Sequence, residues 1–282
     1  MSQVDLHLHS TASDGRLSPA EVVRQSAKLG LTVIAITDHD SVGGIAAALE
    51  AARAFPQLRV IPGVELNTDV PGGEVHVLGY FIDYTNAKLL GELKESQGSR
   101  ETRAKKMLVK LGQLGIHIDW DRVKELAGEG SIGRPHVAQA MFEKGYVTSI
   151  RDAFNKYIGQ GGPAYVEREK KTPVAAAQLV LEAGGLPVLG HPFTAAEPEN
   201  MIITLKEVGL VGMEVYYNNY TLKETNELLR LARKYDLIAT GGSDYHGLDN
   251  TSETMIGGVA VPMESVEQLL ALAKQHDRRF IS

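Results

Sequence analysis

Hydrophobic and polar residues alternate with a period of two in several short segments of the chain, the first of which spans residues 4–9. This period is typical of a β-strand, from which His7 and His9 would project on the same face. Patterns typical of helices separate these segments. The first helix is expected after Ser18, because a serine followed by Pro19 and Glu21 suits a helix N-terminus. Short strands that alternate with helices predict parallel β/α units.

This alternation holds at both ends of the chain and breaks in the middle. Residues 1–85 have predicted strands at 4–9, 32–37, 59–66 and 75–82 and a second helix at 45–55. Residues 172–282 have predicted strands at 186–190, 211–216, 237–241 and 256–261 and helices at 173–183, 222–235 and 265–276. Residues 86–171 instead have helical segments at 89–114, 121–127, 135–144 and 150–157 and one short strand at 164–166. We therefore expect an α/β barrel built from 1–85 and 172–282, with 86–171 as a helical insertion that covers the active site.

Side chains able to bind a divalent cation stand at or just after most of the predicted strands. They are His7, His9, Asp14, His39, Glu65, His76, His191, Asp244 and His246. Liganding groups after nearly every strand predict a metal cluster at the C-terminal rim of a barrel, where enzymes of this architecture place their chemistry.

Each candidate ligand also has a plainer interpretation. His7 and His9 could bind backbone groups at a strand end, and Asp14 with Gly15 is an ordinary turn pair. Glu74 competes with Glu65 for a ligand role; we favour Glu65, because a charge at the end of an apolar strand is costly to bury unless it is paired or bound to a metal. Glu214 could orient a histidine or be purely structural.

Composition narrows the chemistry. The chain of 282 residues is 43% hydrophobic, carries a net charge of −6 and has no cysteine, so any metal must take nitrogen and oxygen ligands. That donor set suits manganese, iron, zinc or magnesium better than ions that prefer thiolates, and manganese is the ion we expect first. The acidic balance argues weakly against a general nucleic-acid-binding surface. We expect no membrane span and no signal peptide, because a strand already begins at Val4, and hence a cytoplasmic protein.

The insertion carries candidate substrate contacts. Arg100 and Arg103 lie three residues apart on a predicted helix and would face the same way. Ser131, Arg134 and His136 open another helix, a place suited to binding an anion. The alternative for the two α-helical arginines is a solvated face in a charged run.

Together these residues resemble a known family. The motifs are DLHLHS from Asp5, SDG from Ser13, TDHD from Thr37, PGVE from Pro62, His76, GHP from Gly190 and SDYH from Ser243. They resemble the PHP (polymerase and histidinol phosphatase) superfamily over essentially the whole chain. RETRA from Arg100 and GRPH from Gly133 look most like its TrpH/YciV branch, which includes nucleoside 3′,5′-bisphosphate phosphatases and a 5′–3′ exoribonuclease.

The resemblance implies a distorted (β/α)7 barrel with a centre of two to three divalent metal ions. It would place His7, His9, Glu65 and Asp244 on one metal. A second metal would share Glu65 with His76 and His191, and a third would be bound by Asp14, His39 and His246.

The resemblance also implies hydrolysis of a phosphate ester by water activated at the metals. Arg100, Arg103 and Arg134 would hold a second phosphate, since the planar fork of arginine binds phosphate oxygens bidentately. The expected substrate is the 3′-phosphate of a nucleoside 3′,5′-bisphosphate, or short RNA attacked from its 5′ end, with no obligate protein partner. The alternatives are a histidinol-phosphate phosphatase and a non-catalytic, regulatory PHP domain.

Overall fold

The computed structural model describes residues 3–70, 73–128, 130–167, 171–218, 220–247 and 253–275. Over these residues seven strands form one sheet whose order follows the chain. The strands are β1 (Val4–Leu8), β2 (Val33–Ile36), β3 (Arg59–Val70), β4 (Gly73–Tyr80), β5 (Leu186–Gly190), β6 (Gly212–Tyr217) and β7 (Ile238–Gly242).

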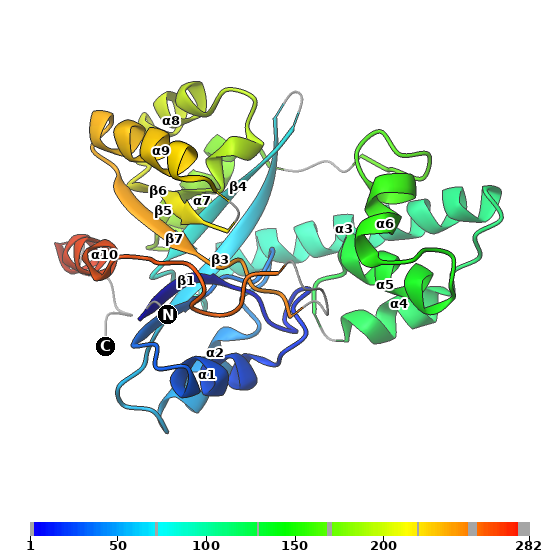
Figure 1. Ribbon diagram of the computed structural model, residues 1–282, viewed down its shortest axis with the longest axis horizontal. Coiled ribbons are helices and arrows are strands. Elements are labelled where there is room, and N and C mark those ends of the chain that lie inside the picture. Colours follow the sequence, from blue (N-terminus) through cyan, green and yellow to red (C-terminus); the bar gives the residue numbers. More distant parts are fainter. Residues whose placement is uncertain are drawn as a thin grey trace.

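Helices follow most of these strands (Figure 1). The α-helices are α1 (Pro19–Lys28), α2 (Ile45–Ala52), α3 (Ala87–Gln113), α4 (Trp120–Ala127), α5 (Arg134–Glu143), α6 (Ile150–Ala153), α7 (Pro173–Glu182), α8 (Pro198–Lys206), α9 (Leu222–Lys234) and α10 (Met263–Gln275). A π-helix, η1 (Phe154–Ile158), continues α6, and a 3-10 turn, η2 (Pro192–Thr194), follows β5. Ser18 and Glu21 form the expected capping box at the start of α1.

The sheet closes into a distorted barrel, which confirms the predicted fold class. The backbone N–H of Asp244 donates to the carbonyl of His7 at 3.0 Å, and the N–H of His9 donates to the carbonyl of Tyr245 at 3.0 Å. These bonds join the end of β7 to the end of β1. Apolar strand residues such as Leu6, Leu78 and Val188 are fully buried and pack in one cluster.

The distortion arises at β4. This strand pairs antiparallel with both β3 and β5, whereas the other neighbouring pairs are parallel. Strand β3 continues past the predicted end at Leu66 to Val70 and pairs with β4 along its length. Because β4 runs in the opposite direction, His76 lies in its first half and is opposite Gly190 at the end of β5. Glu65 was expected near the end of its strand, which was wrong because β3 continues to Val70. His76 lies inside a strand, as the predicted bounds 75–82 imply, but not at the end where a ligand was expected.

The helices α3 to α6 lie together on one side of the barrel (Figure 1). They share a hydrophobic cluster of their own, which includes Leu111, Val123, Val137 and Met141. The long helix α3 joins this cluster to the barrel.

Two predicted strands are absent from the described residues, and one helix was missed. At 164–166 the carbonyls of Tyr165 and Val166 accept hydrogen bonds from side chains of α3 in place of a neighbouring strand. At 256–261 Gly257, with a φ of 70°, turns the chain. The missed helix is α8. Within the described residues, no helix is long and apolar enough to span a membrane.

Candidate metal centre

The predicted ligands converge at one rim of the barrel, although they come from segments far apart in the sequence. Among the described residues, three groups have ligand atoms within 4.8 Å of one another. The groups are His7, His9, Glu65 and Asp244; His9, Asp14, His39 and His246; and His39, Glu65 and His76. Because His9, His39 and Glu65 each belong to two groups, the three groups form a single cluster.

The first group joins the start and the end of the barrel. The Nε2 of His7 lies 3.1 Å from Glu65 Oε2 and 3.2 Å from Asp244 Oδ1. The Nε2 of His9 lies 3.2 Å and 3.0 Å from the same two oxygens. Two imidazoles thus face two carboxylates, in the set that the resemblance assigns to one metal.

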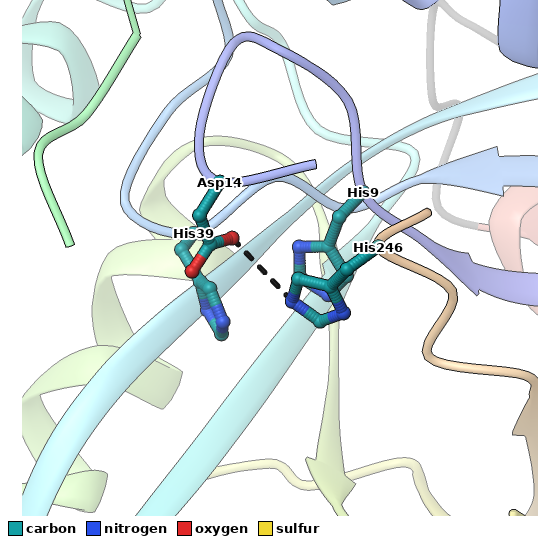
Figure 2. A group of neighbouring side chains, drawn as sticks. All are labelled: His9, Asp14, His39 and His246. Atoms are coloured by element: carbon teal, nitrogen blue, oxygen red, sulfur yellow. Dashed lines mark ion pairs between the residues drawn. The ribbon is translucent and has the colours of Figure 1, made fainter. Parts of the chain in front are cut away.

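The second group lies around the loop that follows β1 (Figure 2). Asp14 Oδ1 is 3.4 Å from His246 Nε2, and the rings of His9 and His246 stack at 4.0 Å. The resemblance assigns Asp14, His39 and His246 to one metal, and the structure adds His9 to this group.

Glu65 is the centre of the third group. Its Oε1 lies 2.6 Å from His76 Nδ1 and 3.0 Å from His191 Nε2, and its Oε2 lies 2.9 Å from His39 Nδ1. One carboxylate therefore faces imidazoles on both of its oxygens, as a bridging ligand would. How the ligands divide among the ions remains a prediction.

Buried polar atoms that make no hydrogen bond provide a test of whether metals fit this cluster. Buried polar atoms without a hydrogen bond include both ring nitrogens of His9, Asp14 Oδ1, His76 Nε2 and Asp244 Oδ1. Such atoms are costly unless something compensates them. Divalent cations would do so, since every one of these atoms is an imidazole nitrogen or a carboxylate oxygen. The donor set fits the proposed ions.

The electrostatics of the cluster suit ligand chemistry at His76 and Glu65, whereas at His246 the effect of burial is overcome by Asp14 and Asp244, which raise its pKa to about 10. Burial lowers the pKa of His76 to about 4 despite the nearby Glu65, so its imidazole stays neutral, the form that binds metals. Burial would raise the pKa of Glu65, but His39, His7 and His76 hold it well below its usual value. Glu65 is therefore a carboxylate at neutral pH.

Two of the predicted ligands have unusual backbone conformations. His191 has a φ of 24° and Asp244 a φ of 53°, both in the left-handed region that side chains other than glycine rarely adopt. Such strain is found preferentially at functional sites, where the surrounding structure holds it in place.

Glu214 contacts two of the predicted ligands, as the sequence suggested it could. Its Oε1 lies 2.9 Å from His7 Nδ1, and its Oε2 accepts a hydrogen bond of 2.8 Å from the N–H of His191. With one nitrogen of His7 facing Glu214, the other is directed toward Glu65 and Asp244.

Sequence reasoning missed two further side chains, one that contacts the cluster and one that supports a loop carrying part of it. The hydroxyl of Tyr217 donates to Asp244 Oδ2 at 2.6 Å, which leaves Oδ1 facing the histidines. Asp38 accepts from Ser10 N–H, Ser10 Oγ and Ser13 Oγ, each at 2.7 Å, and so fixes the loop that carries Asp14. Asp38 stands in the same TDHD motif as His39, a signal that was present; nothing local marked Tyr217.

The two α3 arginines among the predicted phosphate contacts have different partners. Arg100 donates through Nε to Asp40 Oδ2 at 2.8 Å, and its buried Nη2 has no hydrogen-bond partner. Arg103 donates to the carbonyl of Val166 at 2.8 Å and stacks over Tyr165. Both arginines are largely buried, so the interpretation as a solvated face was wrong.

The second predicted cluster of the insertion lies near Asp14. A Cβ built on Gly133 would lie 3.4 Å from Asp14 Oδ2 and 3.8 Å from Arg100 Nη1. Ser131 Oγ is buried without a hydrogen bond. Arg134 lies over the ring of Phe154, and His136 Nδ1 accepts from the N–H of Gly133 at 2.9 Å. Their roles toward a substrate remain predictions.

With fold and site in view, the chain belongs to the PHP domain family, which matches residues 5–159. It is 36% identical over 246 residues to a 5′–3′ exoribonuclease of Haemophilus influenzae, covering 86% of this chain and 89% of that protein. It is 32% identical over 253 residues to a 3′,5′-nucleoside bisphosphate phosphatase of Chromobacterium violaceum, covering 87% and 88%. A crystal structure from Bifidobacterium adolescentis, assigned as a metal-dependent phosphoesterase, is similar with a TM-score of 0.88 and 28% identity over 95% of each chain. The resemblance noted from the motifs is confirmed.

Proposed function

We propose that this chain is a metal-dependent phosphoesterase that hydrolyses phosphate esters of nucleotides. Its preferred substrate would be the 3′-phosphate of nucleoside 3′,5′-bisphosphates, with short RNA from the 5′ end as a related substrate. The observation that carries the proposal is the single buried cluster in which Glu65 faces imidazoles on both oxygens. Relatives named for both activities support it. The proposal includes a cytoplasmic location, where nucleotides and RNA are available.

The metals belong to the same proposal. We infer two to three divalent ions with manganese as the first choice, because three overlapping groups of nitrogen and oxygen donors are available. When bound, clustered ions of this kind supply an activated water and neutralise charge on the phosphoryl oxygens. No serine or cysteine nucleophile is then needed.

The protein's own groups would orient these ligands and the substrate. Glu214 holds His7 and the backbone of His191, while Asp38 fixes the loop of Asp14. Arg100 is held by Asp40 close to Gly133, so its free Nη2 is available for a phosphate oxygen. Together with Ser131 and Arg134 it would bind the phosphate that is not cleaved, because charge-assisted hydrogen bonds from arginine suit phosphate.

Two alternatives from the sequence are less well supported. A histidinol-phosphate phosphatase must accommodate an amine, and the buried guanidinium of Arg100 beside the cluster disfavours a cation there. A non-catalytic, regulatory domain does not need a complete ligand set, and here each predicted ligand belongs to the cluster or contacts it.

A substrate panel tests the proposal. The protein would be purified anaerobically, analysed for metals, and assayed with adenosine 3′,5′-bisphosphate, short 5′-phosphorylated RNA, histidinol phosphate and p-nitrophenyl phosphate. We expect the bisphosphate to give the highest kcat/KM and to yield the nucleoside 5′-phosphate. Preferred turnover of histidinol phosphate, or no turnover of any ester by the metal-loaded protein, would contradict the proposal.

A further inference from the structure

A cavity of about 360 Å³ lies between the barrel and the insertion, next to the metal cluster. Its lining includes Asp14 and Gly15 from the loop after β1, and Asp14 also belongs to the cluster. The rest of its lining comes from Thr11 and Arg16 on that loop and from Leu126, Pro135, His136, Gln139, Glu143 and Ile150 in the insertion. This volume is at the small end of the range for ligand-binding pockets.

The cavity has an apolar wall and a polar rim. Leu126, Pro135 and Ile150 provide the apolar contacts. At the rim, Arg16 donates to Gln139 Oε1 at 2.6 Å, and Gln139 Nε2 donates to Glu143 Oε1 at 3.2 Å. A flat ring with hydrogen-bonding edges is the kind of group that such a lining suits.

His136 adds a directed donor. Its Nδ1 accepts the N–H of Gly133 at 2.9 Å, so the ring proton must reside on Nε2. The side chain thus lines the cavity as a fixed imidazole with one N–H.

The proposed phosphate contacts are distinct from the lining of this cavity. Pro135 and His136 line the cavity, whereas Arg100, Ser131 and Arg134 are not part of its lining. A nucleoside bisphosphate carries three groups on its ribose, namely two phosphates and a base. The metal cluster and the arginines would bind the two phosphates, which leaves the cavity for the base.

We propose that this cavity binds the base of the nucleotide whose phosphate is cleaved at the metal cluster. The assignment rests on the proposed function and extends it, because it makes the base a determinant of substrate choice. The base would stack against the apolar wall and place its edge at Gln139 and His136. The product nucleotide would leave through the same opening.

The test compares a nucleotide with the same molecule lacking its base. The two ligands are adenosine 3′,5′-bisphosphate and 1-deoxyribose 3,5-bisphosphate, and both kcat/KM and Kd are measured on the metal-loaded protein. We expect the wild type to prefer the nucleotide by about tenfold, a usual gain for filling a pocket of this kind. Leu126→Trp would fill the cavity and reduce that preference to about one.

Controls keep the result interpretable. Leu114→Trp makes the same change at an exposed residue of the insertion and should keep the tenfold preference. If Leu126→Trp fails to fold, Gln139→Leu removes the polar rim and should lower the preference about threefold, the loss of roughly one hydrogen bond. A wild-type preference near one, or a preference unchanged in the Leu126 variant, overturns the assignment.

The two proposals fail in different ways. If neither ligand is hydrolysed but the nucleotide still binds about tenfold more tightly than the base-free analogue, the cavity assignment stands and the proposed reaction fails. If both ligands are hydrolysed equally well, the reaction stands and the cavity assignment fails.

Discussion

The barrel rim and the insertion satisfy their charged side chains in different ways. At the rim, imidazoles and carboxylates face one another, and single residues such as Glu65 serve several neighbours at once. The three candidate arginines of the insertion have different kinds of partner: Asp40 for Arg100, a backbone carbonyl for Arg103 and the ring of Phe154 for Arg134. A substitution at the rim would therefore disturb several contacts at once. A substitution of one arginine in the insertion would remove a single contact, so substrate specificity can change there without loss of the cluster.

Metal removal should produce the largest effect and should act on the rim. We expect chelation to abolish turnover and to lower the melting temperature by roughly 5–15 °C, because ions bound only to the native state add a few kcal/mol to its stability. Calorimetry and hydrogen exchange would measure this. The strands that carry the ligands should lose protection before α3 to α6 do. A melting temperature that does not respond to chelation would contradict the cluster as a metal site.

Asp244→Asn tests whether the rim acts as a unit. The substitution keeps the shape but removes a charged ligand that faces both His7 and His9. We expect kcat to fall by roughly a thousandfold or more and at least one metal equivalent to be lost, with the fold intact. Asp236→Asn, an exposed aspartate with a similar positive φ, is the matched control and should behave as wild type. Full activity in the Asp244 variant would refute the assignment.

Tyr217→Phe tests whether a residue that contacts a predicted ligand, without being one, contributes to metal affinity. The hydroxyl that directs Asp244 Oδ1 toward the histidines would be gone, so metal affinity should fall about 10- to 100-fold. Metal titration of the apoprotein would show this even if turnover at saturating metal changes little. Tyr216→Phe, one residue earlier on β6, should leave the affinity unchanged. Equal affinities in the two variants would make the hydrogen bond of Tyr217 merely structural.

Arg134→Ala should have the smallest effect, confined to one class of substrate. If this residue holds the uncleaved phosphate, loss of a charge-assisted hydrogen bond costs roughly 1.5–3 kcal/mol, or about ten- to a hundredfold in kcat/KM. The loss should appear with a nucleoside bisphosphate and not with p-nitrophenyl phosphate, and the metals should stay bound. Arg151→Ala is the control at an exposed arginine of α6. Equal losses on both substrates would place Arg134 at the reacting phosphate.

The same contrast governs what could be predicted from the sequence. The convergence of the predicted ligands was readable because period-two segments and strand ends fix where His7, His9 and Asp244 project. The antiparallel direction of β4 could not be predicted, because the direction in which a strand pairs depends on neighbouring strands that can be distant in sequence. Arg100 and Arg103 share a helix face in any helix, yet one meets Asp40 and the other a carbonyl at Val166. Those partners come from segments whose position only the tertiary packing determines.

The hydrogen bonds that close the barrel also set the time at which the enzyme can first act. They join His7 and His9 to Asp244 and Tyr245. These bonds cannot form until the segment after β7 has been synthesised. On a translating ribosome only the group of His39, Glu65 and His76 can assemble early, because the other two groups need Asp244 or His246. An unfinished chain therefore lacks two of the three groups until the segment after β7 has been made.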